Sequence, residues 1–472
     1  MLPKISKIQE LKENQTTAFL IDNTNQLESV SLTDSEKKYV EEKLKEEQEA
    51  SLFRYPNIIF FHKEKDAKKY LQTEAARKAG AAFFDNLKKE KIKSVQISRF
   101  GKKHLTLPFL EGLLLSDYSF SKYKKKKDDN APDEILIADN AVSEEQIEEL
   151  VKITEAVFHS RNLINEPLSY LTAKKYSEEM EKMGNEAGFK VEVFNKKKIE
   201  SLRMGGLLAV NKGSIDPPTF SILEWNPENA KNKKPIVLVG KGVVYDTGGL
   251  SLKPTPKSMD YMKSDMGGAA VVASAIYAIA KNKLPVHVIG LVPATDNRPD
   301  GNAYVPGDII TMYDGTTVEI RNTDAEGRLL LADALSYAKK YKPELVIDLA
   351  TLTGSAPMIA AHHALIAMGN NEDSLQKLKQ TGEETFERLV EVPLWEEFGK
   401  PLKSSVADLN NLGAREGQTS IAGKFLEHFT DYPWLHLDIA GVAFLHEKDS
   451  YRPEGGTGFG TRLLYHFLKK FN

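Results

Sequence analysis

Cysteine is absent from the 472 residues of this chain. Without it the protein has no disulfide bonds, no thiolate metal sites and no cysteine nucleophile. Long apolar runs are missing too: the most apolar run, 266–280, has 15 residues, whereas a helix needs about 20 to cross a bilayer. The first residues lack the apolar core of a signal peptide. We therefore expect a cytoplasmic protein with no membrane partner.

Neither sign of charge is in excess. The chain carries 64 basic and 67 acidic residues, a net charge of −3, so its overall charge does not favour a polyanion as partner. Apolar residues make up 41%, and adding the 31 glycines among 472 residues brings this share to about 48%, which is ordinary for a globular protein. This composition excludes a mainly disordered chain, and the length predicts two or three domains.

Several catalytic signatures are also missing. Ten histidines are present, but none forms the H-E-x-x-H pattern of a zinc-binding helix. The G-x-S-x-G turn of serine hydrolases is absent, and so is the G-x-x-x-x-G-K-[ST] loop that binds nucleotide phosphates. One histidine doublet, His362-His363, lies in an alanine-rich stretch. We expect it to serve in packing or at the surface rather than to bind metal.

The first part of the chain, residues 1–142, is expected to form a small α/β domain. Short apolar runs at 57–61 and 94–98 predict buried strands, and the apolar residues of 66–87 between them have helical spacing. Another strand-like run covers 135–138. These alternating signals indicate strands that are covered by helices.

Residues 143–165 predict a helix that connects this domain to the rest of the chain. Ser143 is a favourable N-cap, and acidic residues follow it in the first turn. The helix is expected to end before Pro167, because the residue that precedes a proline resists the α conformation.

The remaining residues, 166–472, predict a larger C-terminal α/β domain. Its nearly continuous apolar strands alternate with helices, a pattern typical of a mostly parallel sheet flanked by helices. The strands are expected at 236–239, 286–292 and 345–349, and the helices at 267–281 and 328–340. Sheets of this kind bind ligands at the carboxyl ends of their strands.

The loop after the strand 236–239 is the first candidate for a site at that edge. It contains Lys241, Asp246, the pair Gly248-Gly249 and Lys253. The glycines allow a close approach of the backbone to a ligand or a positive φ angle, and a lysine and an aspartate five residues apart can converge on one point. A tight turn with a surface ion pair is the alternative.

Two further candidates precede predicted helices. Asp265 comes just before the helix 267–281, where it could instead serve as the N-cap. Asp324 and Glu326 precede the helix 328–340, together with Arg328. Here Asp324 could cap the helix and Glu326 could pair with Arg328. Capping explains one of these two carboxylates but not both.

If these four carboxylates converge, their mutual repulsion must be offset, because like charges a few ångströms apart cannot all stay ionised. Divalent cations such as Mg²⁺, Mn²⁺ or Zn²⁺ are the simplest solution for ligands rich in oxygen. Two such ions about 3.5–4 Å apart activate water and polarise a carbonyl. They would also hold Lys241 neutral by lowering its pKa, so that its amine could itself be a ligand.

These segments resemble the leucyl (cytosol) aminopeptidase family. The motifs that carry the resemblance are 240–253, 262–270, 322–329, 348–354 and 436–441, and the similarity extends over about 161–464. The segment 322–328, Asn-Thr-Asp-Ala-Glu-Gly-Arg, is close to diagnostic of the family. The N-terminal part matches only loosely, mainly through 111–120.

The resemblance implies a metal-dependent exopeptidase that removes N-terminal residues from peptides. One metal would be held by Lys241, Asp246, Asp265 and Glu326, and a more exchangeable one by Asp246, Asp324 and Glu326, with a water bridging the two. The ions would be zinc or manganese, with magnesium or cobalt as alternatives. Lys253 would stabilise charge on the attacked carbonyl, and Arg328 would hold a bicarbonate ion that takes the proton from the bridging water. A homohexamer with interior active sites is also implied.

The resemblance further implies a pocket for the first residue of the substrate. Its residues are Met262, Thr351, Leu352, Gly354, Ala440 and Ala443. Family members commonly have methionine where this chain has Ala443, so we expect a wider pocket. The predicted preference is leucine, methionine and other apolar residues, with tolerance of bulky ones.

Two other functions remain alternatives. Residues 51–127 carry 19 basic and 7 acidic residues, a net +12, so this region could track nucleic-acid phosphates or serve a regulatory role, alone or alongside catalysis. No base-reading motif accompanies the charge, and a solvated lysine face explains it better. A nucleotide-binding module built on the glycine loops is disfavoured, because the acidic cluster would repel phosphate.

Overall fold

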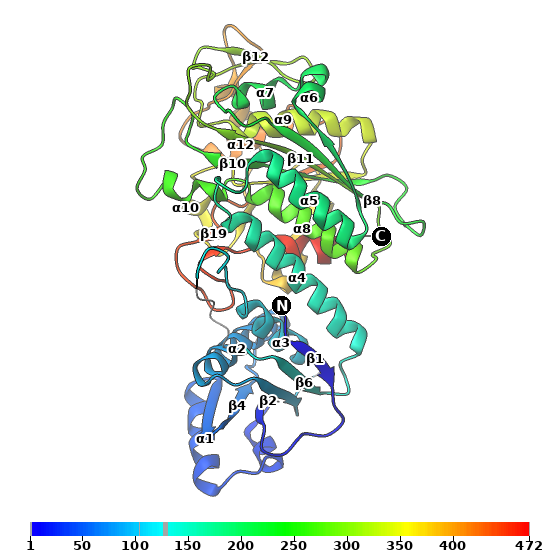
Figure 1. Cartoon of the computed structure of the whole chain (residues 1–472), viewed down its shortest axis with the longest axis vertical. Coiled ribbons are helices and arrows are strands. Elements are labelled where there is room, and N and C mark those ends of the chain that lie inside the picture. Colours follow the sequence, from blue (N-terminus) through cyan, green and yellow to red (C-terminus); the bar gives the residue numbers. More distant parts are fainter. Residues whose placement is uncertain (1, 103, 126–130, 472) are drawn as a thin grey trace. The chain divides into compact units, whose positions relative to one another are not determined.

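The structure is a computed structural model that describes residues 2–102, 104–125 and 131–471. The chain forms two compact units (Figure 1). The first contains Met1–Glu155 and Glu447–Glu454, and the second contains Ala156–His446 and Gly455–Asn472. The helix α4 (Glu144–Asn165) contributes residues to both. The sequence-based boundaries at 142 and 165 stay a prediction.

The first unit is built on a six-stranded sheet whose strand order is β1-β6-β5-β2-β4-β3. All neighbours in the sheet are parallel except β3 and β4. The strands are β1 (Lys4–Lys7), β2 (Thr16–Ile21), β3 (Glu49–Arg54), β4 (Asn57–Lys63), β5 (Ser94–Arg99) and β6 (Glu134–Ala138). The helices are α1 (Asp34–Glu46), α2 (Lys69–Glu90) and α3 (Thr106–Ser116), with the short 3-10 helix η1 (Thr24–Ser29).

Two glycines bring α2 and α3 together. A Cβ atom on Gly80 would lie 2.0 Å from the carbonyl oxygen of Phe109, and one on Gly112 would lie 1.8 Å from that of Arg77. Only glycine permits so close a contact between backbones. The two helices bury a cluster that includes Phe83, Phe109 and the strand residue Phe60. This packing confirms that the N-terminal part has a core of its own.

The second unit is built on a nine-stranded mixed sheet with the order β16-β15-β18-β14-β9-β11-β8-β7, and β10 also pairs with β11. Its central strands β18, β14, β9 and β11 are parallel. Strand β8 is antiparallel to β11 and to β7, and β15 is antiparallel to β18 but parallel to β16. The strands are β7 (Lys190–Phe194), β8 (Thr219–Trp225), β9 (Ile236–Gly240), β10 (Gly242–Asp246), β11 (Val288–Asn297), β14 (Leu345–Ala350), β15 (Leu365–Gly369), β16 (Leu389–Glu391) and β18 (Trp434–Asp438).

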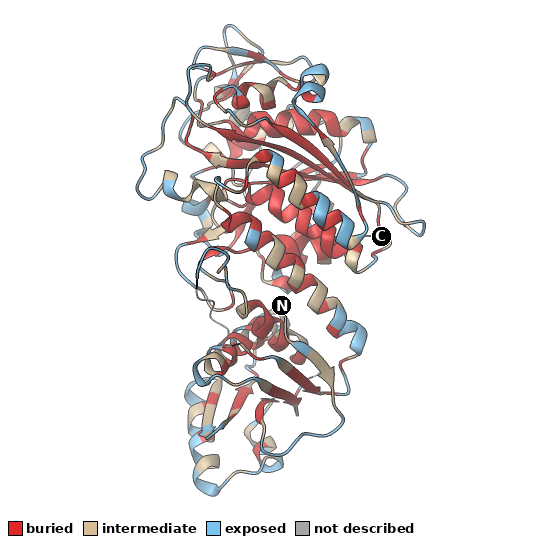
Figure 2. Cartoon of the chain, in the orientation of Figure 1, coloured by how far each residue is buried: buried red, intermediate tan, exposed pale blue. Residues whose placement is uncertain are grey.

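Helices cover both faces of this sheet (Figure 1). On one face α5 (Ala173–Ala187) and α13 (Thr461–Lys469) pack on α8 (Gly267–Lys281), and on the other α7 (Gly205–Asn211) and α12 (Gln418–Glu427) pack on α9 (Gly327–Ala338). Figure 2 shows the central strands and α8 as a continuous buried layer. The apolar runs of the sequence form this layer because both faces of each strand are covered.

Short elements complete the second unit. They are the helices α6 (Lys196–Leu202), α10 (Ala356–Ala360) and α11 (Glu372–Thr385), the 3-10 helices η2 (Met259–Ser264), η3 (Lys339–Tyr341) and η4 (Glu396–Leu402), and the strands β12 (Ile309–Thr311), β13 (Thr317–Glu319), β17 (Leu409–Asn410), β19 (Phe444–Leu445) and β20 (Gly455–Gly456). Across the described residues, no helix has the length and apolarity that a bilayer crossing requires.

The predicted elements agree with the structure except at several ends. The strand expected at 286–292 begins at Val288 and continues to Asn297. It passes through Pro293, which cannot donate a ladder hydrogen bond, at the point where its parallel neighbour changes from β9 to β10. The basic stretch 51–127 is described except at 103, 126 and 127, which lie outside the described residues.

Candidate active site

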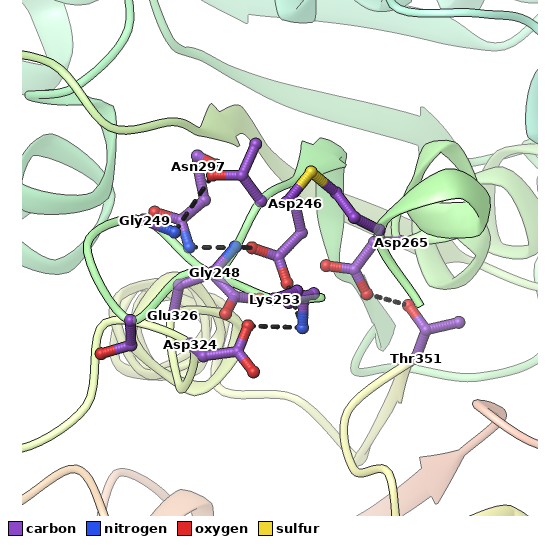
Figure 3. Close-up of polar contacts among 12 residues, drawn as sticks. Asp246, Gly248, Gly249, Lys253, Asp265, Asn297, Asp324, Glu326 and Thr351 are labelled. Atoms are coloured by element: carbon purple, nitrogen blue, oxygen red, sulfur yellow. Dashed lines mark hydrogen bonds and ion pairs between the residues drawn. The ribbon is translucent and has the colours of Figure 1, made fainter. Parts of the chain in front are cut away.

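The candidate residues lie at the carboxyl edge of the large sheet and come from several separate segments of the chain. Lys241 separates β9 from β10, and Asp246 is the last residue of β10. Asp265 lies between η2 and α8, whereas Asp324 and Glu326 lie just before α9. Parallel strands bring these turns together at one edge, where ligands of such sheets bind. Figure 3 shows the carboxylates of the four acids facing one another.

Three of the carboxylates form one tight group. Asp246, Asp265 and Glu326 each offer one oxygen atom, and these atoms all lie within 4.8 Å of one another. All three residues are buried. Asp324 joins them through a shared lysine, because the Nζ atom of Lys253 is 2.9 Å from Asp246 Oδ2 and also forms an ion pair with Asp324. The structure therefore brings together the four acids that the sequence singled out.

Lys241 occupies the other side of the group. Its Nζ atom lies 2.8 Å from Asp265 Oδ1 and 2.8 Å from Glu326 Oε1, and it donates to the carbonyl oxygen of Thr351 at 2.9 Å. Burial alone would lower the pKa of Lys241, but the surrounding carboxylates outweigh burial and raise it above its ordinary value. In the metal-free chain this lysine is therefore protonated. Its neutral form is expected only beside bound cations.

The acids carry strongly perturbed pKa values. Burial raises the pKa of Asp265 well above its ordinary value, and the neighbouring carboxylates add to this effect. Burial, Asp246 and Glu326 together raise the pKa of Asp324 to about 7. Glu326 differs: burial would raise its pKa, but Lys241 and Lys253 outweigh burial and lower it. Four carboxyl groups thus face two ammonium groups, and the raised pKa values reflect the cost of ionising all four side by side.

The residues present fit divalent cations. The Oε2 atom of Glu326 is buried and accepts no hydrogen bond from any described residue, although a buried carboxylate oxygen ordinarily has a partner. Carboxylate oxygens and a lysine amine converge from several directions on the space between Asp246, Asp265 and Glu326. Hard divalent cations prefer oxygen-rich ligand sets of this kind.

Asp246 is held in place by the turn that follows it. Its Oδ1 atom accepts hydrogen bonds at 2.8 Å from the backbone amide of Gly248 and from the side-chain amide of Asn297. Gly248 has a φ angle of +85°, and a Cβ atom there would lie 2.4 Å from the carbonyl oxygen of Ser251. Glycine is required at this position for both reasons. The turn thereby fixes the direction of the carboxylate.

Sequence reasoning missed Asn297. Its amide also donates to the carbonyl oxygen of Thr323 at 2.9 Å, so it ties Asp246 to the segment that carries Asp324 and Glu326. The predicted strand ended at residue 292, five residues before Asn297. A strand extended to the carboxyl edge would have placed this polar residue beside the acids.

The alternative roles in helix capping are wrong. The N-cap of α8 is Met266, and Asp265 instead accepts from Lys241 and from the Thr351 hydroxyl group, both at 2.8 Å. The N-cap of α9 is Glu326, and no side chain caps that helix. Glu326 pairs with Lys241 rather than with Arg328. Nor do Lys241 and Asp246 form a surface ion pair, because both residues are only 2% exposed.

A cavity of about 490 Å³ opens onto the acids. The six residues predicted to bind the substrate all line it: Met262, Thr351, Leu352, Gly354, Ala440 and Ala443. A Cβ atom on Gly267 would lie 3.2 Å from the Cβ atom of Ala443 and 3.5 Å from Thr351 Cγ2, so this end of the cavity is close to the start of α8. The cavity therefore continues from the acidic cluster to the predicted side-chain pocket.

Arg328 lines the same cavity from the first turn of α9. It is 5% exposed, and its Nε atom has no hydrogen-bond partner among the described residues. Burial lowers its pKa to about 10, so it remains charged at neutral pH. Its Cζ atom lies 5.8 Å from the centre of the Phe425 ring, and Glu326 and Asp438 attract it without forming an ion pair among the described residues. An anion beside this buried guanidinium group would offset the remaining cost of its burial. His362 and His363, in contrast, are both exposed, as expected.

Comparisons with known proteins identify the family of this chain. The catalytic domain of the cytosol aminopeptidase family matches residues 158–465. A probable cytosol aminopeptidase of Chlorobium phaeobacteroides is 46% identical over 402 residues, which cover 80% of this chain and 79% of that protein. One of Chlorobium limicola is 44% identical over 424 residues, with 84% and 83% covered.

A solved structure is similar over nearly the whole chain. The bottromycin maturation enzyme BotP in complex with Mn superposes with a TM-score of 0.85 at 28% sequence identity, and the match covers 96% of this chain and 99% of that one. It confirms the predicted α/β fold. Together the matches define the class of this protein as a peptidase, and therefore a hydrolase. The chain belongs to the cytosol aminopeptidase family.

Proposed function

We propose that this aminopeptidase removes the N-terminal residue from peptides at a centre of two divalent cations. The observation that carries the proposal is the group of four converging carboxylates, three of them buried, which only two lysines offset. A site of this charge is costly without cations. The similar enzyme BotP was solved in complex with Mn, which supports a metal at this site.

The ligands divide between two positions. Lys241, Asp246, Asp265 and Glu326 would hold one ion, and Asp246, Asp324 and Glu326 the other. The ions are zinc or manganese, with magnesium or cobalt as alternatives, and when bound they supply polarisation of the peptide carbonyl and of a bridging water. The free α-amine of the substrate would be recognised at the same centre, which restricts cleavage to the first peptide bond.

Two cationic side chains complete the proposed machinery. Lys253 is held between Asp246 and Asp324, and its ammonium group would stabilise the charge that develops on the carbonyl oxygen. Arg328 would hold a bicarbonate ion that accepts the proton of the attacking water. Lys241 would thus be a neutral metal ligand and Lys253 a charged group, because the surroundings of the two lysines shift their pKa values differently.

The residues that line the cavity suggest which N-terminal residues the enzyme removes. Leucine, methionine and other apolar residues are preferred, because the lining includes Met262, Leu352 and Ala440. The small Ala443 leaves room for bulky side chains. We further expect a homohexamer located in the cytoplasm. The alternative function is a nucleic-acid-binding or regulatory role of the basic stretch 51–127. We favour it less than peptide cleavage, so a peptide rather than a nucleic acid is the expected partner.

Substitutions at the acids test the proposal. Asp324→Asn and Glu326→Gln should each lower kcat/KM on leucinamide by about two to three orders of magnitude, because each removes charge that the ions and the transition state require. Circular dichroism should show an intact fold. Asp300→Asn, which changes an exposed acid outside the cavity, should leave kcat/KM within about twofold.

Activity retained in both site variants would reject the proposal. The same assay with alanine, leucine and phenylalanine amides checks the side-chain preference. Alanine cleaved as well as leucine and phenylalanine would contradict the apolar pocket.

A further inference from the structure

A second, smaller cavity of about 220 Å³ adjoins the first at Arg328. Arg328, Leu412 and Gln418 line both cavities, so these three residues form the wall between them. The small cavity is otherwise formed by the loop that precedes α12, including the exposed residues Ala414 and Arg415. It therefore reaches Arg328 from solvent without passing the predicted peptide-binding residues.

The charge in this cavity has one sign. Arg328 and Arg415 are the only charged residues among those that line it. The Nε atom of the buried Arg328 has no hydrogen-bond partner within the described residues. The side chain of Arg415 likewise makes no hydrogen bond or ion pair there. Two guanidinium groups, one buried and one exposed, line this cavity without a carboxylate beside them, and such a pair favours a bound anion.

The start of α12 adds hydrogen-bond donors. This helix has ten residues and begins at Gln418, which lines the cavity. Its N-cap is Gly417 with a φ angle of +68°, so no side chain caps the helix, and its first turn contains no acidic residue. The first amides of a helix lack partners within the helix, and its dipole favours negative charge at this end.

We propose that this side cavity binds a small oxyanion of the size of bicarbonate and passes it to Arg328 by a route separate from the peptide cleft. The inference deepens the proposed function and rests on the anion that Arg328 holds there. A water takes up about 30 Å³ in the liquid, so the cavity has room for such an anion with several waters. Arg415 attracts the anion at the surface, and the anion reaches the buried arginine within the same cavity because Arg328 also lines it.

The test uses the metal-loaded protein in buffer depleted of carbon dioxide, with bicarbonate as the probe. One readout is the bicarbonate concentration that gives half the maximal rate on leucinamide. The other is the rise in Tm that bicarbonate causes without substrate, measured against chloride at equal ionic strength. Arg415→Gln removes the outer charge. Ala414→Trp fills the side cavity without touching the peptide cleft, and Arg321→Gln changes an exposed arginine outside both cavities.

We expect Arg415→Gln to raise the half-maximal bicarbonate concentration about fivefold, as loss of one exposed charge contact implies, and to reduce the bicarbonate-dependent rise in Tm. Ala414→Trp should act in the same direction. The KM for leucinamide at saturating bicarbonate should stay within about twofold, and Arg321→Gln should match the unmodified protein.

Three results would overturn the inference. An unchanged bicarbonate dependence in both cavity variants would mean that the anion arrives through the peptide cleft. A KM that rises in Arg415→Gln for leucylglycine but not for leucinamide would mean that the cavity binds the carboxylate of the substrate. The absence of any bicarbonate effect on rate or Tm in the unmodified protein would show that it binds no such anion. Peptidase activity itself is measured in the same assay, so failure of the proposed function is seen separately.

Discussion

The two units of this chain have the same kind of sheet edge and use charge there differently. The cavity at the carboxyl edge of the first unit is lined by five acidic residues and four lysines. Its pair Lys102 and Glu64 is 2.8 Å apart, with the Lys102 side chain 53% exposed and the Glu64 side chain 4% exposed. In the second unit, Lys241 and three of the four acids are at most 5% exposed. The number of charges is similar, but their hydration is not.

This difference separates an ordinary charged surface from a site. Glu64 is buried, but the ammonium group of its partner Lys102 stays hydrated, and a pair with one exposed partner contributes little. Buried carboxylates lose their hydration at a cost of several kcal/mol each, which only close countercharges can offset. The second unit keeps such a cluster because its segments supply Lys241, Lys253 and the amide of Asn297. Buried charge excess, rather than acidity, is what indicates a cation site.

Substituting one lysine at each sheet edge tests the difference between the two edges most clearly. Lys253→Met should lower kcat/KM on leucinamide about 10²–10³-fold with a smaller change in KM, because the lost ammonium group stabilises charge that develops during the reaction. Lys102→Met, the matched change in the first unit, should leave both constants within about twofold. Steady-state kinetics on the two purified variants measures this. Comparable losses in both variants would erase the distinction between the edges.

A smaller effect is expected from a buried histidine in the first unit. His62 is 1% exposed, and neither of its ring nitrogens has a partner among the residues described. Burial lowers its pKa to about 4, against about 6.5 in the unfolded chain. Between these values the unfolded chain binds the extra proton, so the free energy of unfolding falls as the pH drops from 6.5 toward 4.

The loss for this one group is about 2 kcal/mol between pH 7.5 and pH 5. His62→Leu should remove that part of the pH dependence. Hydrogen exchange of peptides from β2 and β4 in urea at both pH values measures it, with His363→Leu, an exposed position, as the control. An unchanged pH dependence in His62→Leu would show that another group is responsible.

The sequence predicted those strands and turns whose own residues form a recognisable local pattern. Strands such as β9 and β14 are buried on both faces, so unbroken apolar runs reveal them. The acids at 246, 265, 324 and 326 stood out because their segments are dense in glycine and charge. The short, partly exposed strands β7 and β16 gave no such pattern.

Contacts between distant segments could not be predicted. Residues Glu447–Glu454 belong to the first unit, where Lys448 pairs with Asp85 at 2.6 Å and the Tyr451 hydroxyl group donates to Glu74 at 3.0 Å. These residues are more than 360 positions apart, and no local pattern links them. Asn297 was missed for a similar reason, because its role depends on where β11 ends beside β10.

The central claim, that buried excess charge at the second edge exists to hold cations, is tested most directly by metal content. Atomic absorption of the purified chain, together with its activity before and after chelation, should give two divalent ions per chain and an activity that disappears with the ions and returns with Mn²⁺ or Zn²⁺. Glu326→Gln should retain fewer ions than the unmodified protein, and Glu64→Gln in the first unit should retain both. A chain that binds no metal and hydrolyses leucinamide at full rate after chelation would contradict the account.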